Sequence, residues 1–209
     1  MVGVDTSRVI KPPVLYPGTP VVLLSSVNPD GSANLAPMSS AWAIGDMLAL
    51  GLGTEGQTFA NLSARPECVV NFADEDLWKQ VEALAPLTGA DPVPAHKAAL
   101  YRTERDKFGA AGLTSLPAEL VAAPRVAECP IQVECRVVNP RAAVHDGAAI
   151  VEARVLRVHA HASVVEPDDR HIRVDEWRPL FYLFRHYVGR GPELGRTFKA
   201  TAFSPDRRS

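Results

Sequence analysis

The sequence has few of the features that mark secreted, membrane or nucleic-acid-binding proteins. Its three cysteines, Cys68, Cys129 and Cys135, cannot form a complete set of disulfides, and a reducing cytoplasm is the expected location. The N-terminus lacks the basic-then-apolar pattern of a signal peptide, and no apolar run approaches the roughly 18 residues of a membrane span. The net charge is −2, whereas a nucleic-acid partner calls for a basic surface. We therefore expect neither a membrane nor a nucleic-acid partner.

Familiar catalytic and metal-binding motifs are missing as well. The sequence has no G-x-S-x-G, its cysteines lack an adjacent base, and their spacing is too wide for a zinc pair. His159 and His161 are two apart on an expected strand and so share a face, and His171 or Asp169 would have to supply a third ligand. Such histidines more often line a half-polar strand face or a dimer seam. We expect no bound metal.

What the sequence does contain is a series of short apolar strands near its start. They are expected at Val21–Val27, Ala33–Ala43 and Met47–Leu52. The first two are joined through residues 28–31, whose Asp-Gly pair is a strong hairpin signal because Gly tolerates positive φ. A Gly-Asp turn at residues 45–46 joins the second to the third. Consecutive hairpins indicate antiparallel strands.

The rest of the chain alternates helical and strand-like segments. We expect helices at residues 57–64, at 75–84 behind the capping residue Asp74, and at 95–109, and strands at Glu67–Ala73, Ala127–Val138 and Ala148–Val165. Strands near both ends with helices between them predict a mainly β protein with added helices, built on a closed or split antiparallel barrel. We expect residues 1–209 to form a single domain with a helical insertion at about residues 75–125.

A glycine-rich turn precedes the first expected helix. Three glycines lead into a Gln-Thr pair and then an asparagine: Gly51, Gly53, Gly56, Gln57, Thr58 and Asn61. Helix starts of this kind suit a phosphate, because their backbone N–H groups are free and the helix dipole favours negative charge. Thr58 and Asn61 share a helix face. Thr58 would bond a phosphate oxygen and Asn61 would brace the loop above it, or both would form a polar face in water.

The same turn is also a literal G-x-G-x-x-G, which raises a second possibility. It follows a strand and precedes a helix, and Asp74 lies beyond the next strand, as in a dinucleotide-binding fold. Three observations argue against that fold. The helix must end before Pro66, which is short for a crossover between parallel strands; the preceding strands are hairpin-linked; and no further strand–helix units follow. Both interpretations place a nucleotide phosphate near residues 57–61.

Ordered segments along nearly the whole chain carry a family resemblance. They are Asn34-Leu35-Ala36-Pro37-Met38-Ser39-Ser40, Gln57-Thr58 with Asn61-Leu62, Val69-Val70-Asn71-Phe72, residues 128–135, and Pro179-Leu180-Phe181-Tyr182 with Tyr187 and Gly195. In this ordered set the sequence resembles the flavin reductase-like FMN-binding split-barrel proteins, a group that includes flavoredoxin. Residues 87–126 carry no such signal.

The resemblance implies an FMN-binding oxidoreductase, most simply a homodimer that transfers hydride from NADH or NADPH to FMN. Because the flavin supplies the reactivity, no catalytic side chain is required. The reduced flavin would serve a flavin-dependent monooxygenase or another electron acceptor. Two alternatives stay open: a non-catalytic FMN carrier or electron-transfer protein, and a flavoenzyme with its own organic substrate. The sequence does not decide between NADH and NADPH, or between FMN as substrate and as prosthetic group.

The resemblance also implies which residues would hold the cofactor. They lie at a strand end, the glycine turn, the helix start and the C-terminal segment: Asn34, Ala36, Pro37, Met38, Ser39, Ser40, Gly51, Leu52, Gly53, Gln57, Thr58, Asn61, Arg185, His186 and Tyr187. The two serines would face the ribityl chain and phosphate, or would only satisfy their own turn. The last three would lie at the edge of the site, often across a dimer, or would form a cationic helix face.

Overall fold

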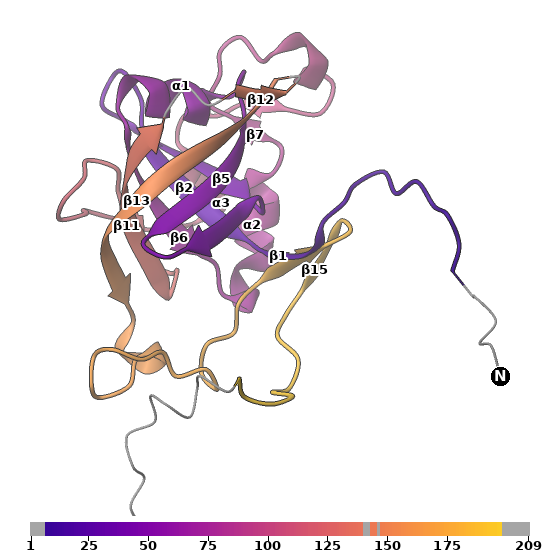
Figure 1. The fold of residues 1–209 in the computed structure, drawn as a ribbon. Helices are drawn as coiled ribbons and strands as arrows, with labels where there is room; N and C mark the ends of the chain where they lie inside the picture. The colour runs from indigo at the N-terminus through magenta and orange to yellow at the C-terminus, as the bar shows by residue number, and fades with distance from the viewer. Residues whose placement is uncertain (1–6, 140–142, 146, 198–209) are drawn as a thin grey trace, which may run out of the picture.

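The computed structural model describes residues 7–139, 143–145 and 147–197. Its centre is an eight-stranded sheet in which all neighbours are antiparallel. In spatial order the strands are β3 (Ala33–Met38), β2 (Val22–Val27), β6 (Glu67–Phe72), β11 (Ile131–Asn139), β13 (Ala148–Ala160), β5 (Met47–Gly53) and β4 (Ala41–Ile44), with β12 (Ala143–His145) also paired to β13. The sheet curls into a half-barrel (Figure 1), which confirms the expected mainly β split-barrel fold.

The two edges of this sheet are joined by only two residues. β3 and β4 follow one another in the chain, yet β3 pairs with β2 and β4 pairs with β5 at the opposite edge. The expectation of one strand over Ala33–Ala43 is therefore wrong, because the chain leaves one edge after Met38 and joins the other at Ala41. Ser39 and Ser40 form the link.

The dinucleotide-binding alternative is also wrong. In that fold the strands before and after the first helix lie in a parallel sheet. Here β5 precedes α1 (Gln57–Ala64) and β6 follows it, but β5 lies between β13 and β4, whereas β6 lies between β2 and β11. The G-x-G-x-x-G therefore does not open a parallel strand–helix–strand unit.

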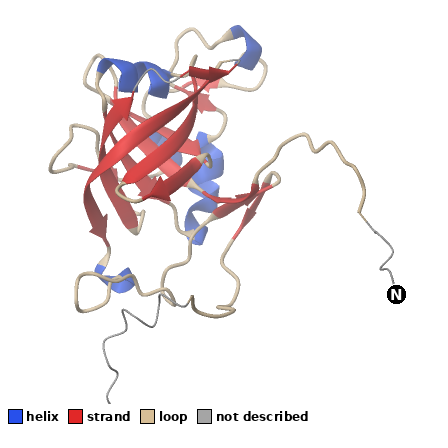
Figure 2. Cartoon of the chain, viewed as in Figure 1, coloured by secondary structure: helices blue, strands red, loops and turns tan. Residues whose placement is uncertain are grey.

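Both faces of β2 and β6 are buried, which explains the apolar runs at residues 21–24 and 68–70, whereas β13 alternates buried and exposed residues. In β2, Val22 and Leu24 point to the inside of the half-barrel, where they meet Leu50, and Leu23 points to the outside. On the outside, Leu23 packs in a cluster with side chains of α2 (Trp78–Leu84). α1 covers one end of the curled sheet (Figure 2) and contributes Leu62 to the inner cluster.

The segment between β6 and β11 contains several short elements. They are η1 (Glu75–Leu77), α2, β7 (Leu87–Thr88), η2 (Ala95–Lys97), β8 (Arg102–Thr103), α3 (Lys107–Ala111), β9 (Ser115–Leu116) and β10 (Arg125–Val126). Asp74 caps η1 as expected, because its side chain accepts a hydrogen bond from the Asp76 amide at 3.1 Å. No helix in the described part of the chain is both long and apolar enough to cross a membrane.

The expected continuous helix at 95–109 is wrong. The amides of Arg102 and Glu104 donate to the carbonyls of Pro86 (3.0 Å) and Thr88 (2.9 Å), so this segment forms a short parallel pairing with β7. Non-local backbone bonds replace the local helical ones that the residue types favour.

The end of the chain adds a second, smaller sheet. β1 (Pro17–Pro20) pairs with β14 (Phe181–Leu183), which pairs with β15 (His186–Val188). Phe184 and Arg185, both at positive φ (43° and 72°), form the turn. The expected strand at Ala148–Val165 ends at Ala160 and is followed by η3 (Ala162–Val164), and β11 begins four residues later than expected.

Candidate functional site

The serine link between the sheet edges lies directly against the glycine-rich segment 51–56. The structure places residues 51–53 of this segment in β5 and only the remainder in a turn; we call the whole segment the glycine turn. The Gly51 amide donates to the Ser40 carbonyl at 2.7 Å, and a Cβ added to Gly51 would lie 2.8 Å from the Ser40 Cβ. Real Cβ atoms do not approach so closely, so Gly51 must be glycine for the link to lie where it does. Two segments that are 11 positions apart in the sequence, 40 and 51, thus meet.

A buried network of amides and hydroxyls lies at the end of the half-barrel covered by α1. The Asn34 amide nitrogen donates to Ser26 Oγ (3.1 Å) and to Thr58 Oγ1 (3.0 Å). The Asn61 amide nitrogen donates to Ser26 Oγ (3.0 Å) and to Asn28 Oδ1 (2.9 Å). All five residues are buried, and we call them the amide network. Thr58 and Asn61 are therefore not a polar face in water; both point into the protein.

A buried lysine completes this network from a distant segment. The Lys107 ammonium donates to Asn34 Oδ1 at 3.0 Å, and the residue is only 4% exposed. Burial lowers the pKa of Lys107 to about 8, although the charge of Glu104 raises it. Because an ammonium only donates hydrogen bonds, it requires the oxygen of the Asn34 amide to face it and the nitrogen to face Thr58.

The N-cap position at the start of α1 is held by a glycine, which has no side chain to accept from the first helical amides. Because this residue is Gly56, the first amides of the helix are not satisfied in the usual way. The side-chain amide nitrogen of Gln57 donates to Asn61 Oδ1 at 2.7 Å. The Gln57 side chain therefore lies along the helix, toward Asn61. The helix start is thus electropositive and open to an acceptor.

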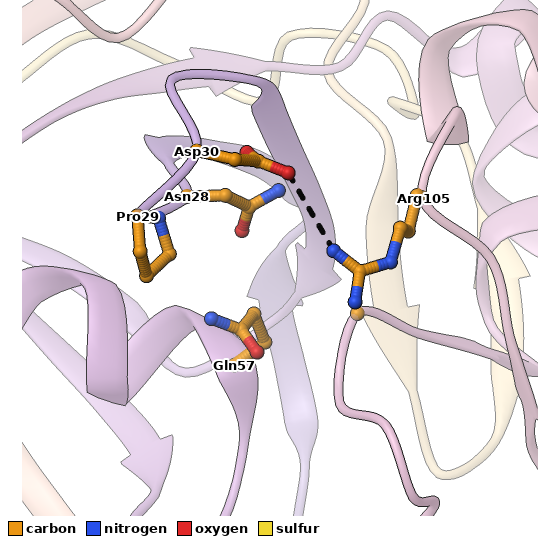
Figure 3. Close-up of a pocket in the computed structure, with 6 residues that line it drawn as sticks. Asn28, Pro29, Asp30, Gln57 and Arg105 are labelled. Atoms are coloured by element: carbon orange, nitrogen blue, oxygen red, sulfur yellow. Dashed lines mark ion pairs between the residues drawn. The ribbon is translucent and has the colours of Figure 1, made fainter.

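A small pocket of about 200 Å³ opens beside this helix start (Figure 3). It is lined by Asn28, Pro29, Asp30, Gln57, Gly89 and Arg105. Asp30 reaches across it to Arg105, with 3.6 Å between the carboxylate and guanidinium. A Cβ added to Gly89 would lie 2.9 Å from Asn34 Oδ1, so the pocket wall lies against the amide network.

Other expected site residues take part in packing. Met38 and Leu52 pack against the inner apolar cluster, and Ala36 and Pro37 are half-buried on the edge strand β3. Gly53 is exposed, and a Cβ added there would find its nearest neighbour at 4.0 Å. Ser39 is half-buried in the link.

A chain of aromatic rings connects the C-terminal hairpin to the serine link. Tyr187 lies 6.0 Å from Tyr182, which lies 5.5 Å from Tyr16 (centroid distances), and the Tyr16 hydroxyl lies 2.9 Å from Ser40 Oγ. Tyr187 also donates to Glu82 at 3.0 Å; burial, and then this bond, raise the pKa of its phenol.

Arg185 and His186 lie exposed at the tip of this hairpin. The alternative that residues 185–187 form a cationic helix face is wrong, because the segment is a turn and a strand.

The strand histidines are engaged in structural bonds. His159 Nε2 lies 2.6 Å from Oε1 of the fully buried Glu134, whose carboxylate also accepts the amides of Glu119 and Leu120. His161 Nε2 lies 2.9 Å from the Ala127 carbonyl oxygen. Among the residues described, no three histidine, cysteine or acidic side chains are grouped as metal ligands.

The sequence from residue 17 to residue 190 matches the family model described as "Flavin reductase like domain". That range includes the serine link, the glycine turn, α1 and the C-terminal hairpin. The chain belongs to the flavin reductase-like domain family.

The chain is also similar to individual proteins in sequence and in fold. The flavin reductase-like chain is 41% identical over 200 residues to the uncharacterized protein YdfE of Bacillus subtilis (strain 168), covering 94% of this chain and 96% of the relative. Its fold is similar to flavoredoxin from Methanosarcina acetivorans (TM-score 0.76, 20% identity, 93% and 97% coverage). It is also similar to nitrilotriacetate monooxygenase component B from Bacillus cereus (TM-score 0.69, 20% identity, 94% and 98% coverage).

The sequence of this flavin reductase-like chain does not single out Tyr16, Ser26 or Asn28, and around Lys107 it favours a solvated helix over a basic contact with a nucleotide. Ser26 pairs directly with Asn34 across β2 and β3, so the hairpin signal with strand alternation was enough to find it. Tyr16 and Lys107 reach the site through long-range contacts, 24 and 73 positions along the chain, for which the sequence gives no local signal.

Proposed function

We propose that this flavin reductase-like protein binds FMN and transfers hydride to it from NADH or NADPH. The observation that carries the proposal is the meeting of the serine link with the glycine turn that leads into the uncapped start of α1. These parts offer hydroxyls and free amides at neighbouring points, which is the donor set that a sugar phosphate needs.

The amide network prepares Thr58 for such a ligand. Its Oγ1 already accepts a hydrogen bond from Asn34, so the hydroxyl proton is left to be donated to another acceptor. The absence of a capping side chain at Gly56 leaves room for a phosphate oxygen at the amides of the first turn. In this proposal the residues of the chain fit the phosphate of FMN.

When bound, FMN supplies the hydride-accepting chemistry. The protein's own part is to hold and orient the two partners. The hairpin tip carries Arg185, whose planar guanidinium suits the pyrophosphate of a nicotinamide dinucleotide. The ring chain of Tyr16, Tyr182 and Tyr187 fixes the distance between this tip and Ser40, because its members are held by ring contacts and two hydroxyl bonds.

The cofactor proposal is tested by comparing FMN with riboflavin, which lacks the phosphate. Thr58→Ala is expected to weaken FMN binding by about tenfold, the value of a hydrogen bond to a charged group, and to leave riboflavin binding nearly unchanged. Thr58→Ser, which keeps the hydroxyl, is the matched control and should retain FMN affinity. Equal weakening of both flavins by Thr58→Ala would show that Thr58 does not contact the phosphate.

The electron-donor proposal is tested by mixing the FMN-loaded protein anaerobically with NADH or NADPH and recording flavin bleaching. Bleaching by at least one donor is expected. Arg185→Ala should raise KM for that donor and leave FMN affinity unchanged, since the lost contact belongs to donor binding. If neither donor bleaches the flavin, the protein is instead an FMN carrier or a flavoenzyme with its own organic substrate. For an active reductase, we propose a flavin-dependent monooxygenase as one acceptor.

A further inference from the structure

Lys107 is a buried ammonium whose described hydrogen-bond partner is a neutral amide, the Oδ1 atom of Asn34. Ion pairs normally offset the cost of burying such a charge. We propose that Lys107 is a positioning residue for the phosphate site at the start of α1: it fixes the Asn34 amide that holds Thr58, and its charge favours a bound phosphate. The proposal rests on the proposed function, because it assumes that the phosphate of FMN binds at this helix start.

The hydrogen-bond directions follow from the lysine. Since Lys107 has no acceptor, Asn34 must present its oxygen to the ammonium. Both N–H groups of that amide are then directed to Ser26 and Thr58. Thr58 Oγ1 therefore accepts a hydrogen bond from Asn34, and the hydroxyl proton of Thr58 points away from Asn34. If Lys107 is removed, the Asn34 amide is free to rotate and the donor at Thr58 is lost.

The charges around Lys107 leave it poorly compensated. Glu104 is the carboxylate whose field acts on it, whereas Asp106 on the same element is engaged in capping α3 through the Gly109 amide at 2.9 Å.

The neighbouring elements add little compensation. β3 and α1 present the neutral side chains of Asn34, Thr58 and Gln57. α2 packs on α3 through apolar side chains, and its Glu82 accepts a bond from Tyr187. Across the pocket, Asp30 is shared between Ser32 and Arg105.

An anion at the start of α1 would therefore interact with a charge that the described residues leave largely unpaired. Interactions of this kind weaken only slowly with distance in a buried setting. The effect must disappear when Lys107 loses its proton, and burial brings its pKa to about 8. Phosphate recognition should accordingly decline across mildly alkaline pH, where the flavin phosphate itself no longer changes charge.

The experiment measures dissociation constants of FMN and of riboflavin by flavin fluorescence from about pH 7 to about pH 9.5. Wild-type protein, Lys107→Met, Lys107→Arg and the control Lys79→Met are compared; Lys79 lies exposed on α2. The quantity to compare is the dissociation constant of riboflavin divided by that of FMN. A general loss of folding or of ring binding changes both dissociation constants equally and so leaves this ratio unchanged.

For wild type and for Lys79→Met, we expect the ratio to fall by about tenfold across this range. Lys107→Met should give a low ratio that does not change with pH. Lys107→Arg keeps its charge throughout and should give a ratio with little pH dependence that lies above that of Lys107→Met.

A pH-dependent ratio that is the same in wild type and Lys107→Met would overturn the role of Lys107 and leave FMN binding in place. A ratio near one in all variants, with both flavins bound, would show that the phosphate does not bind at the start of α1. That result would also overturn the role of Lys107. If neither flavin binds wild type, the proposed function itself fails, and this inference fails with it.

Discussion

Asn34 is the residue on which most of the site's polar contacts converge. Its amide bonds Ser26, Thr58 and Lys107 at once, from a position that is 2% exposed. Asn34→Leu keeps the approximate size of the side chain and removes all three bonds. It should lower the free energy of unfolding by about 2 to 4 kcal/mol, because it leaves a buried ammonium and two buried hydroxyls with fewer partners.

Urea unfolding measures this loss. Asn139→Leu is the matched control, since Asn139 is exposed at the end of β11 and its replacement should change stability by less than about 0.5 kcal/mol. Equal losses in the two variants would show that the network contributes nothing beyond ordinary surface effects.

Lys107 also gives the folding equilibrium a pH dependence of defined sign. Its pKa is about 8 in the folded protein against the ordinary 10.5, so between these values the unfolded chain binds more protons than the folded one. Stability from this group therefore rises with pH above about 8, by at most about 1.4 kcal/mol per pH unit, and is constant below.

The measurement compares wild type with Lys107→Met, which lacks the titrating group, in urea at about pH 8, 9 and 10. The unfolding free energy of wild type minus that of Lys107→Met should increase as the pH rises. A difference that stays constant with pH, or that decreases as the pH rises, would contradict the interpretation of Lys107 as a buried ammonium.

At this scale the sequence indicated part of the candidate site. Thr58 and Asn61 could be selected because helix geometry places residues three apart on one face, and Asn34 through the family resemblance. Lys107 could not be selected, because a lysine is normally exposed and nothing near it in the chain signals burial. Its position depends on how residues 87–126 fold back over β3, which is a tertiary outcome.

Among the elements, β5 offers a sharp test of the close approach between the glycine turn and the serine link. Gly51→Ala should destabilise the protein by about 1 to 3 kcal/mol, since the new methyl group would overlap Ser40 and force the link away. Gly53→Ala, on the same strand with no atom closer than 4.0 Å, should have little effect.

Thermal unfolding of the two alanine variants separates steric overlap from a general cost or benefit of replacing glycine. If Gly51→Ala and Gly53→Ala unfold alike, the approach of Ser40 to Gly51 is not the constraint that the structure indicates. FMN affinity of Gly51→Ala should also fall, if the serine link contacts the ligand.

Elements with a strong local signal were predicted well, and those shaped by distant contacts were not. The hairpin of β2 and β3 and the helix α1 follow from turn residues and composition. The division between β3 and β4 could not be foreseen, because residues 33–43 contain no glycine to mark a turn and only sheet closure separates the two strands. The pairing of β8 with β7 likewise overrode a helical composition.

For the molecule as a whole, we propose a homodimer. Trp42 (59% exposed) and Ile44 (61%) lie two apart on the edge strand β4 and share a face. An exposed apolar edge favours pairing with another chain. Light scattering should give about twice the 22.5 kDa chain mass.

The double variant Trp42→Lys/Ile44→Lys should shift the mass toward that of one chain, whereas Leu100→Lys, at an 80% exposed position outside the main sheet, should not. A wild-type protein that is monomeric at micromolar concentration and binds FMN would exclude a site shared between subunits.

The two-residue link between the sheet edges has a consequence for the dimensions of the molecule. From Met38 to Ala41 the chain takes three steps, which span at most about 11 Å, so the edges of β3 and β4 cannot separate further at this end. The width of the half-barrel beside the glycine turn is therefore set by chain length as much as by packing. An extra residue inserted between Ser39 and Ser40 would allow this end of the half-barrel to widen. No residue of the candidate site would be replaced by such an insertion.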